Sequence, residues 1–198
     1  MELEADIAKF PKPNSHDVVV KPISSVDCDA VIDIWLSGLK QTSMSFDALS
    51  RIRRKMHFGL KQYGETATGQ GGDMNPSAIL VEWAGCDSLG KSMFVAHIGD
   101  VVVGLCGVAR GCTQMGDDSD SAIPKNTFSL WRMSVSPAAR RMGIGAKLCD
   151  AVESFARQKG GERIRCVTAN PLAARFYQSR GFVVMAPHPI AAWYEKPL

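Results

Sequence analysis

The chain has 198 residues, of which 45% are hydrophobic and 22% are charged, and this balance is typical of one globular domain with its own core. Its net charge of +3 is too small to favour a nucleic-acid partner, and no run of about 20 apolar residues predicts a membrane-spanning helix. The six cysteines contain no Cys-x-x-Cys pair, and the histidines are not paired at metal-ligand spacing. We therefore expect the cysteines to be reduced packing residues, and we expect no metal site.

The N-terminal part of the chain contains a tail, a strand and a helix. Residues 1–16 have no periodicity, so we expect a flexible tail ahead of a single domain over residues 17–198. The apolar run from Asp17 to Ile23 predicts a strand, and Ser24 or Ser25 can cap the helix that follows. Apolar residues at helical spacing define the buried face of that helix: Val31, Ile34, Trp35 and Leu39.

The middle of the chain contains a hairpin between less regular segments. Two strands, Ser92–His97 and Val101–Arg110, are joined by the turn signal Ile98-Gly99-Asp100. The other elements expected here are helices at residues 46–63 and 76–83, a glycine-rich linker at 64–75 and an acidic loop at 111–125.

The most informative stretch begins with a strand from Phe128 to Val135 and a turn at Ser136-Pro137. The segment from Arg140 to Ala146 then opens a helix that ends at Gly160-Gly161, where a glycine can take the left-handed cap. The spacing of the apolar residues predicts one buried helix face: Ile144, Leu148, Val152, Phe155 and Ala156.

Four further elements complete the domain. A strand from Arg163 to Thr168 leads to Asn170 and to Pro171, which suits the first position of a helix. The helix is expected to stop before Gly181. The ranges expected for these elements are a strand at 163–168, a helix at 171–180, and strands at 182–185 and 191–196.

The pair Gly143 and Gly145 lies between a strand and a helix, where backbone N–H groups and the helix dipole favour an anion. Arg140 and Arg141 add positive charge beside it. From residue 128 onward the chain has eleven basic and four acidic residues, a local charge of +7. These features predict a pyrophosphate site.

The order strand, Arg-x-x-Gly-x-Gly, helix, strand, Asn170, Phe176-Tyr177 and Gly181-Phe182 resembles the cofactor-binding half of the GNAT superfamily of N-acetyltransferases, from about residue 92 to the end. The resemblance implies an α/β fold with a mixed, mostly antiparallel sheet of six to seven strands, flanked by helices and splayed at the cofactor site. It implies acetyl-CoA as cosubstrate and no metal. Within the family, the run Leu130-x-Arg132-Met133-Ser134-Val135-Ser136-Pro137 looks most like the camello-like branch, which includes cysteine S-conjugate acetyltransferases.

The resemblance also assigns residue roles. The loop from Arg140 to Ala146 would hold the pyrophosphate, the strand around Ser134 would lend backbone groups to the pantetheine arm, and Asn170 would contact that arm. Tyr177 would be the catalytic residue that protonates the departing thiolate. The implied cofactor-binding residues are Met133, Ser134, Val135, Arg140, Arg141, Met142, Gly143, Ile144, Gly145, Ala146, Asn170, Ala173 and Phe176.

One position departs from the family. Many members place a glutamate on the strand before the loop, where it acts as a base through water, and the matching residue here is Ser129. A serine cannot take a proton at neutral pH. The candidates for a base are Glu82, His97, Asp100 and His188, or a chain of water molecules leading to solvent.

The expected function is direct transfer of acetyl from acetyl-CoA to a primary amine, with a small, amino-acid-like or partly apolar acceptor. In this family the first helices cover the acceptor side. Aromatic and apolar residues that would line it are Trp35, Met44, Phe46 and Trp131. Because the chain lacks the hydrophobic segment of membrane-anchored camello-like enzymes, we expect a cytoplasmic enzyme with a small-molecule amine partner and no membrane or nucleic-acid partner.

Two alternatives belong to other classes of protein. A GNAT domain without a general base can bind acyl-CoA as a sensor or interaction module. The segment Gly85–Ser92 matches the phosphate-binding P-loop pattern, but that pattern requires a helix after it, and the residues that follow predict a hairpin.

Overall fold

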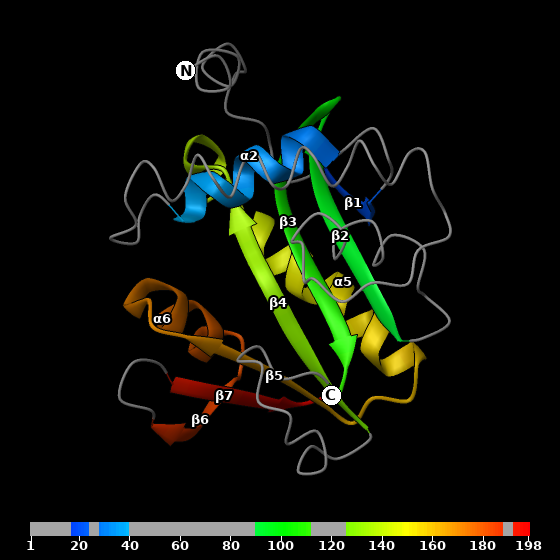
Figure 1. Ribbon diagram of the computed structural model, residues 1–198, viewed down its shortest axis with the longest axis vertical. Helices are drawn as coiled ribbons and strands as arrows, with labels where there is room; N and C mark the ends of the chain where they lie inside the picture. The colour runs from blue at the N-terminus through cyan, green and yellow to red at the C-terminus, as the bar shows by residue number, and fades with distance from the viewer. Residues whose placement is uncertain (1–16, 24–27, 40–89, 112–125, 188–191) are drawn as a thin grey trace, which may run out of the picture.

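The computed structural model describes residues 17–23, 28–39, 90–111, 126–187 and 192–198. These residues form a seven-stranded sheet in the order β1-β2-β3-β4-β5-β7-β6 (Figure 1). Neighbouring strands are antiparallel except β4 and β5, which are parallel, so the expected mixed and mostly antiparallel sheet is confirmed. The strands are β1 Val18–Pro22, β2 Lys91–Ile98, β3 Val101–Arg110, β4 Thr127–Val135, β5 Arg163–Thr168, β6 Val183–Pro187 and β7 Ala192–Pro197.

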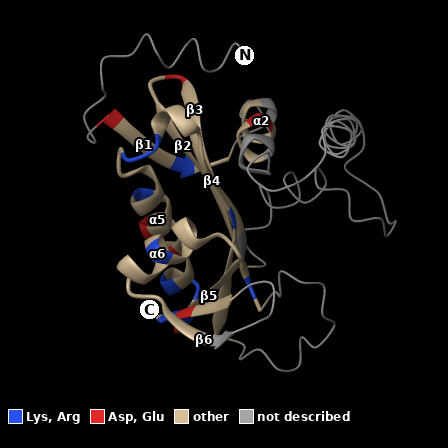
Figure 2. Cartoon of the chain, turned by 90° about the vertical axis from the view of Figure 1, so that its left-hand side faces the viewer, with Lys and Arg blue, Asp and Glu red and all other residues tan. Residues whose placement is uncertain are grey.

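Helices cover both faces of the sheet. The helix α2, Cys28–Leu39, lies on one face, and α5, Ile144–Gln158, and α6, Pro171–Ser179, lie on the other (Figure 2). A short 3-10 helix, Pro137–Ala139, links β4 to the loop before α5. We call the two sides the α2 face and the α5 face.

Each face has its own apolar core. On the α5 face, all five predicted apolar residues of α5 are buried, as the helical spacing requires. The α2 face has a smaller cluster, in which Val31, Ile32 and Ile34 of α2 pack on Met93 and other residues of β2 and β3. The sheet is therefore the middle of three layers.

The sheet opens between β4 and β5. These strands pair only where Thr127, Phe128 and Ser129 lie opposite residues 163–165. Beyond that point β5 leads away from β4, and β7 and β6 follow it (Figure 1). The expected splay is confirmed, and it leaves the outer half of β4 with a strand partner on one edge only, among the described residues.

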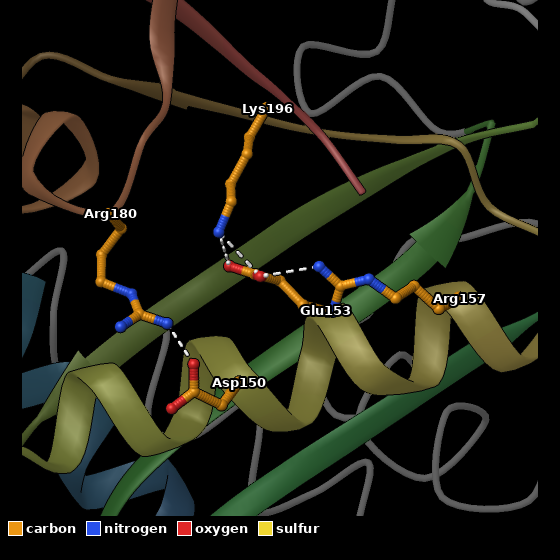
Figure 3. A network of polar contacts seen from close by, with 5 residues as sticks. All are labelled: Asp150, Glu153, Arg157, Arg180 and Lys196. Atoms are coloured by element: carbon orange, nitrogen blue, oxygen red, sulfur yellow. Dashed lines mark hydrogen bonds and ion pairs between the residues drawn. The ribbon is translucent and has the colours of Figure 1, made fainter.

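Ion pairs connect α5 to the strands and helix beyond the opening (Figure 3). Lys196 of β7 donates to both carboxylate oxygens of Glu153 at 2.8 Å, and Arg157 lies 3.5 Å from the same carboxylate. Arg180, after α6, pairs with Asp150 of α5. Because the Glu153 side chain is only 5% exposed, these partners offset the cost of burying its carboxylate.

Most predicted elements are confirmed within one or two residues. Gly99 turns the β2–β3 hairpin with φ +56°, and Gly160 and Gly181 follow α5 and α6 with φ +76° and +86°. The helix α5 begins at Ile144 rather than at Arg140. The predictions that lie outside the described residues are the tail at 1–16, the caps at 24–25, the segments at 46–63, 64–75 and 76–83, and all but the first residue of the loop at 111–125.

Among the described helices, none combines the length and apolar character that crossing a bilayer requires. Within the same part of the chain, no three His, Cys, Asp or Glu side chains are grouped so that they would hold a metal ion. The described cysteines, Cys106, Cys149 and Cys166, are free and buried, as expected of packing residues.

Candidate active site

The loop from Arg140 to Gly143 ends at an uncapped helix N-terminus. Gly143 has φ +76° and no side-chain cap, and the Lys147 N–H donates to its carbonyl oxygen at 3.1 Å as the first hydrogen bond of α5. A Cβ added at Gly143 would meet no heavy atom within 4 Å. The space in front of the helix is therefore open, and the first backbone N–H groups have no partner within the helix. Since the first turn also has no acidic residue, this helix N-terminus suits an anion.

Gly145 has a second role that the sequence did not suggest. A Cβ added there would lie 3.3 Å from Cζ of Phe176, so the glycine lets α6 pack against the first turn of α5. Gly104 of β3 acts similarly, since its Cβ would lie 3.0 Å from a methyl carbon of Ile144. Two glycines therefore fix where this helix begins relative to β3 and α6, while a contact of Gly145 with a ligand stays a prediction.

A β-bulge shapes β4 beside the opening. Leu105 pairs with Ser134 and Gly107 with Trp131, so β4 has one more residue than β3 in this interval. Arg132 takes φ +48°, which is rare for a side chain other than glycine. As a result Trp131 packs on the α2-face cluster, and Arg132 also lies on that face, with its guanidinium 4.1 Å from the ring centre of Trp35.

The end of β4 carries the residues expected to face the pantetheine arm. Met133 and Val135 pack on the α5-face core, whereas the Ser134 hydroxyl donates to the carbonyl of Ile34 in α2 at 3.3 Å. Arg140 Nε donates to the Val135 carbonyl at 3.3 Å, which fastens the loop to the strand. The strand and the loop thus form one continuous wall.

Tyr177 of α6 is buried within the α5-face core. Its ring packs on Phe176 and Phe182, with ring centres 5.4 Å apart in both cases, and on Tyr194. Burial raises the pKa of the phenol well above its usual value, and nearby thiols, Cys166 first, add to the shift. The phenol therefore holds its proton at neutral pH, as a proton donor must.

Asn170 caps α6. Its side-chain oxygen accepts a hydrogen bond from the Leu172 N–H at 2.9 Å, so the amide NH₂ is the part of the side chain suited to a ligand carbonyl. Ala173 and Phe176, about one and two turns further along the helix, are partly buried and pack on the α5-face core. Three of the implied cofactor residues and Tyr177 thus lie on the short segment formed by α6 and its N-cap.

Comparison with known proteins decides the family. A family model described as "Acetyltransferase (GNAT) family" matches residues 65–182, more than half of the chain. The chain belongs to the GNAT family. A Xenopus tropicalis protein named "Probable N-acetyltransferase camello" is 36% identical over 91 residues, which cover 45% of this chain and 37% of that relative. The chain thus matches well under half of the length of this relative.

Solved structures described as acetyltransferases share the fold. The PaiA N-acetyltransferase of Thermoplasma acidophilum, in complex with coenzyme A, has a TM-score of 0.65 at 16% identity, covering 91% of this chain and 99% of that chain. The yncA protein of Salmonella typhimurium, with its cofactor acetyl-CoA, has a TM-score of 0.62 at 18% identity, covering 92% and 94%. At these identities the likeness shows the fold.

The candidate bases do not converge on the opening of this GNAT domain within the described residues. His97 is buried in β2, and β3 and β4 separate it from the splay. Asp100 is exposed in the β2–β3 turn. Ser129 is buried at the last β4–β5 pair. Glu82 and His188, like the acceptor-side residues Met44 and Phe46, lie outside the described residues.

The sequence reasoning missed a partly buried ion pair on the α2 face. Arg165 of β5, opposite Ser129, donates through Nε to Glu195 of β7, and Arg163 lies 3.5 Å from the same carboxylate. Ile164 and Tyr194 point into the α5-face core, so strand alternation turns these charges to the α2 face. The available signal in the sequence was the pair of arginines at alternate positions of the strand, Arg163 and Arg165, which places both on one face of the sheet.

The structure does not provide the helix that the P-loop alternative requires after Ser92. Lys91 and Ser92, the last two residues of the pattern, lie in strand β2, which continues directly into the hairpin with β3. A P-loop needs a helix at this point, because the helix N-terminus completes the phosphate cradle.

Proposed function

We propose that this GNAT domain transfers an acetyl group from acetyl-CoA directly to the primary amine of a small, amino-acid-like or partly apolar acceptor. The observation that supports it most is the combination of a strand edge opened at Ser129 with an uncapped α5 N-terminus at the end of the same strand. Solved relatives of the same fold that are described with coenzyme A or acetyl-CoA add support.

Each part of the cofactor would meet a different element. The pyrophosphate would bind to the first-turn N–H groups of α5 and to Arg140 and Arg141, since the positive end of the helix dipole and two positive side chains meet there. The free edge of β4 at residues 133–135 would pair with the pantetheine amides. Asn170, Ala173 and Phe176 of the α6 segment would form the opposite wall.

The chemistry would depend on position and proton transfer. The acceptor nitrogen attacks the thioester carbonyl carbon, the new N–C bond forms, and the C–S bond breaks. A backbone N–H near Met133 would stabilise the oxyanion that develops. Tyr177 would give its proton to the thiolate and regain one from solvent, and water leading to solvent would take the proton of the amine. Ser129 in place of a carboxylate is consistent with that route.

The test is acetyl-CoA turnover against a panel of amines, amino acids, polyamines and peptides, read as free thiol release and as product mass. We expect small amines and amino acids to be acetylated faster than basic histone-tail peptides. Preference for histone tails would contradict the acceptor class. Tight acetyl-CoA binding by calorimetry without any amine-dependent thiol release would instead support the non-catalytic alternative.

A further inference from the structure

Arg132 is a partly buried charged side chain beside the opening. It lies in the β4 bulge with φ +48°, and its guanidinium is stacked on Trp35 of α2 at 4.1 Å. Its Nη1 atom is buried, and no described residue accepts a hydrogen bond from it. Desolvation lowers the pKa of this guanidinium, although arginine stays charged at neutral pH.

Such an arrangement is costly unless an anion completes it. A buried donor without an acceptor loses its hydration, and a backbone in a sparsely populated conformation adds strain that is typical of binding sites. The neighbouring arginines on this face differ, because Arg163 and Arg165 both have Glu195 as a partner. Among the described residues, no carboxylate lies within ion-pair distance of Arg132.

The position of Arg132 suits the acceptor rather than the cofactor. The bulge begins just beyond Ser129, where β4 and β5 stop pairing, and Arg132 lies on the α2 face. The anion-binding loop leads into α5 on the opposite face. An acetyl group held in the opening is therefore approached by the amine from the side on which Arg132 lies.

We propose that Arg132 binds the carboxylate of the acceptor, so that the substrates are free amino acids or amino-acid conjugates rather than simple amines. The planar guanidinium offers two parallel N–H donors that match two carboxylate oxygens, and the stacking on Trp35 fixes its plane. This inference rests on the proposed acetyl transfer, since it names the acceptor of that reaction.

The first experiment needs no variant. The wild-type protein is assayed with acetyl-CoA and each of the common amino acids, each paired with its own carboxamide, which removes the carboxylate but keeps the α-amine and the side chain. We expect kcat/KM for the best amino acids to exceed that of their carboxamides by about 10–100-fold, the range of a charge-assisted hydrogen bond. Amides or polyamines turned over as well as amino acids would overturn the inference and leave the acetyltransferase activity in place. No turnover of any amine would refute the proposed function itself.

The second experiment assigns the preference to Arg132. Arg132→Gln should reduce kcat/KM for the amino acid by about 10–100-fold and leave the carboxamide nearly unchanged, so that the ratio approaches one. Arg132→Lys keeps the positive charge but lacks the two parallel N–H donors, so it should retain part of the preference for the amino acid over its carboxamide. Comparing ratios cancels the different amine pKa values of acid and amide.

Arg110→Gln is the matched control. Arg110 also places its guanidinium over an aromatic ring, Phe128 at 4.8 Å, but at the opposite end of β4. We expect its acid-to-amide ratio to equal that of the wild type. Equal losses for acid and amide in folded Arg132→Gln, with unchanged acetyl-CoA binding, would show a merely structural arginine and overturn the assignment.

Discussion

The two faces of the sheet are built differently. The α5 face has one apolar cluster that extends from Val18 of β1 to Tyr194 of β7 and so continues on both sides of the opening. The cluster on the α2 face is confined to α2, β2, β3 and neighbouring residues, and the strands at the opening present Arg132, Arg165 and Glu195 there instead. Beside the opening, the α5 face therefore consists of packed apolar residues, whereas the α2 face presents individual charged side chains.

This difference separates two tasks. The loop proposed to bind the cofactor needs a helix N-terminus in the right place, and close contacts at Gly104 and Gly145 on the α5 face fix that position. Binding the carboxylate of an acceptor, the role proposed for Arg132, would need charges at particular points, and the α2 face has charged side chains beside the opening. A fold shared with many acetyltransferases can thus keep one cofactor site and change its acceptor through a few residues.

The largest effect is expected from Tyr177→Phe, and it tests whether the α5 face contributes to catalysis as well as to packing. Tyr177→Phe removes one hydroxyl and keeps the ring, so a general acid should be lost while packing survives. We expect kcat to fall roughly 10²–10⁴-fold, with acetyl-CoA affinity by calorimetry little changed. The loss should shrink for acyl donors with a more acidic thiol.

Tyr194→Phe is the matched control for this variant. Tyr194 is also a buried tyrosine of the same cluster, with its ring centre 6.4 Å from that of Tyr177. Its hydroxyl has no assigned role, so kcat should change little. Wild-type kcat in Tyr177→Phe, with chemistry shown to be rate-limiting, would make Tyr177 a wall of the cofactor site only.

The next effect concerns the thiols buried on the α5 face. Burial, with Glu153 as a further cause, raises the pKa of Cys149 from 9.0 to about 12. Above pH 9 the unfolded thiol loses its proton while the native thiol keeps it, so the unfolding free energy falls as pH rises. The slope is up to about 1.4 kcal/mol per pH unit for this thiol.

Urea unfolding under reducing conditions at several pH values between 9 and 11 measures this slope. Cys149→Ala leaves a small cavity at every pH, so it lowers the whole curve, but it should also make the decline shallower by roughly the slope of one group. Parallel curves for variant and wild type would show that Cys149 titrates normally in the folded protein.

The sequence predicted the elements whose determinants are local. Gly160 and Gly181 end their helices in the left-handed conformation, and Asn170-Pro171 begins α6 with a side-chain cap, all within a few residues of the chain. The apolar spacing of α5 likewise needs no distant partner. The fold follows largely from such signals, together with the family resemblance, whereas the binding of the cofactor by the loop at residues 140–146 stays a prediction.

Features that depend on distant partners could not be predicted in this way. No glycine or proline marks the bulge at Arg132, which arises from the register of β4 on β3. The packing of Gly145 on Phe176 and the pairing of Arg165 with Glu195 each join residues about thirty positions apart. The α2 face beside the opening was therefore the region that sequence reasoning described least.

A moderate effect on stability would sharpen the contrast between buried and exposed charges. Lys196→Met leaves the carboxylate of Glu153 buried, with Arg157 of α5, at 3.5 Å, as its remaining ion-pair partner among the described residues. We expect a loss of roughly 1–3 kcal/mol in unfolding free energy. Arg163→Met is the control, because that half-exposed arginine shares Glu195 with Arg165, and its loss should stay below about 1 kcal/mol. Similar losses for both variants would mean that burial of Glu153 does not matter.

The smallest effect expected tests the cofactor loop itself, and the two ends of α5 provide the comparison. Gly143 and Gly160 both have φ +76°, and an added Cβ would meet no atom within 4 Å at either position. Alanine at each should cost about 1–2 kcal/mol of stability through the same left-handed strain. Gly145 is unsuitable for this test, since its Cβ would press on Phe176.

Only the N-terminal glycine lies where the pyrophosphate is proposed to bind. Gly143→Ala should therefore weaken acetyl-CoA binding by roughly tenfold, about 1.4 kcal/mol, because its methyl group occupies the open space in front of the helix. Gly160→Ala should bind acetyl-CoA as the wild type does. Equal weakening in both variants would mean that strain transmitted along α5, rather than contact with the cofactor, is responsible. Wild-type binding in a folded Gly143→Ala would move the pyrophosphate away from this loop altogether.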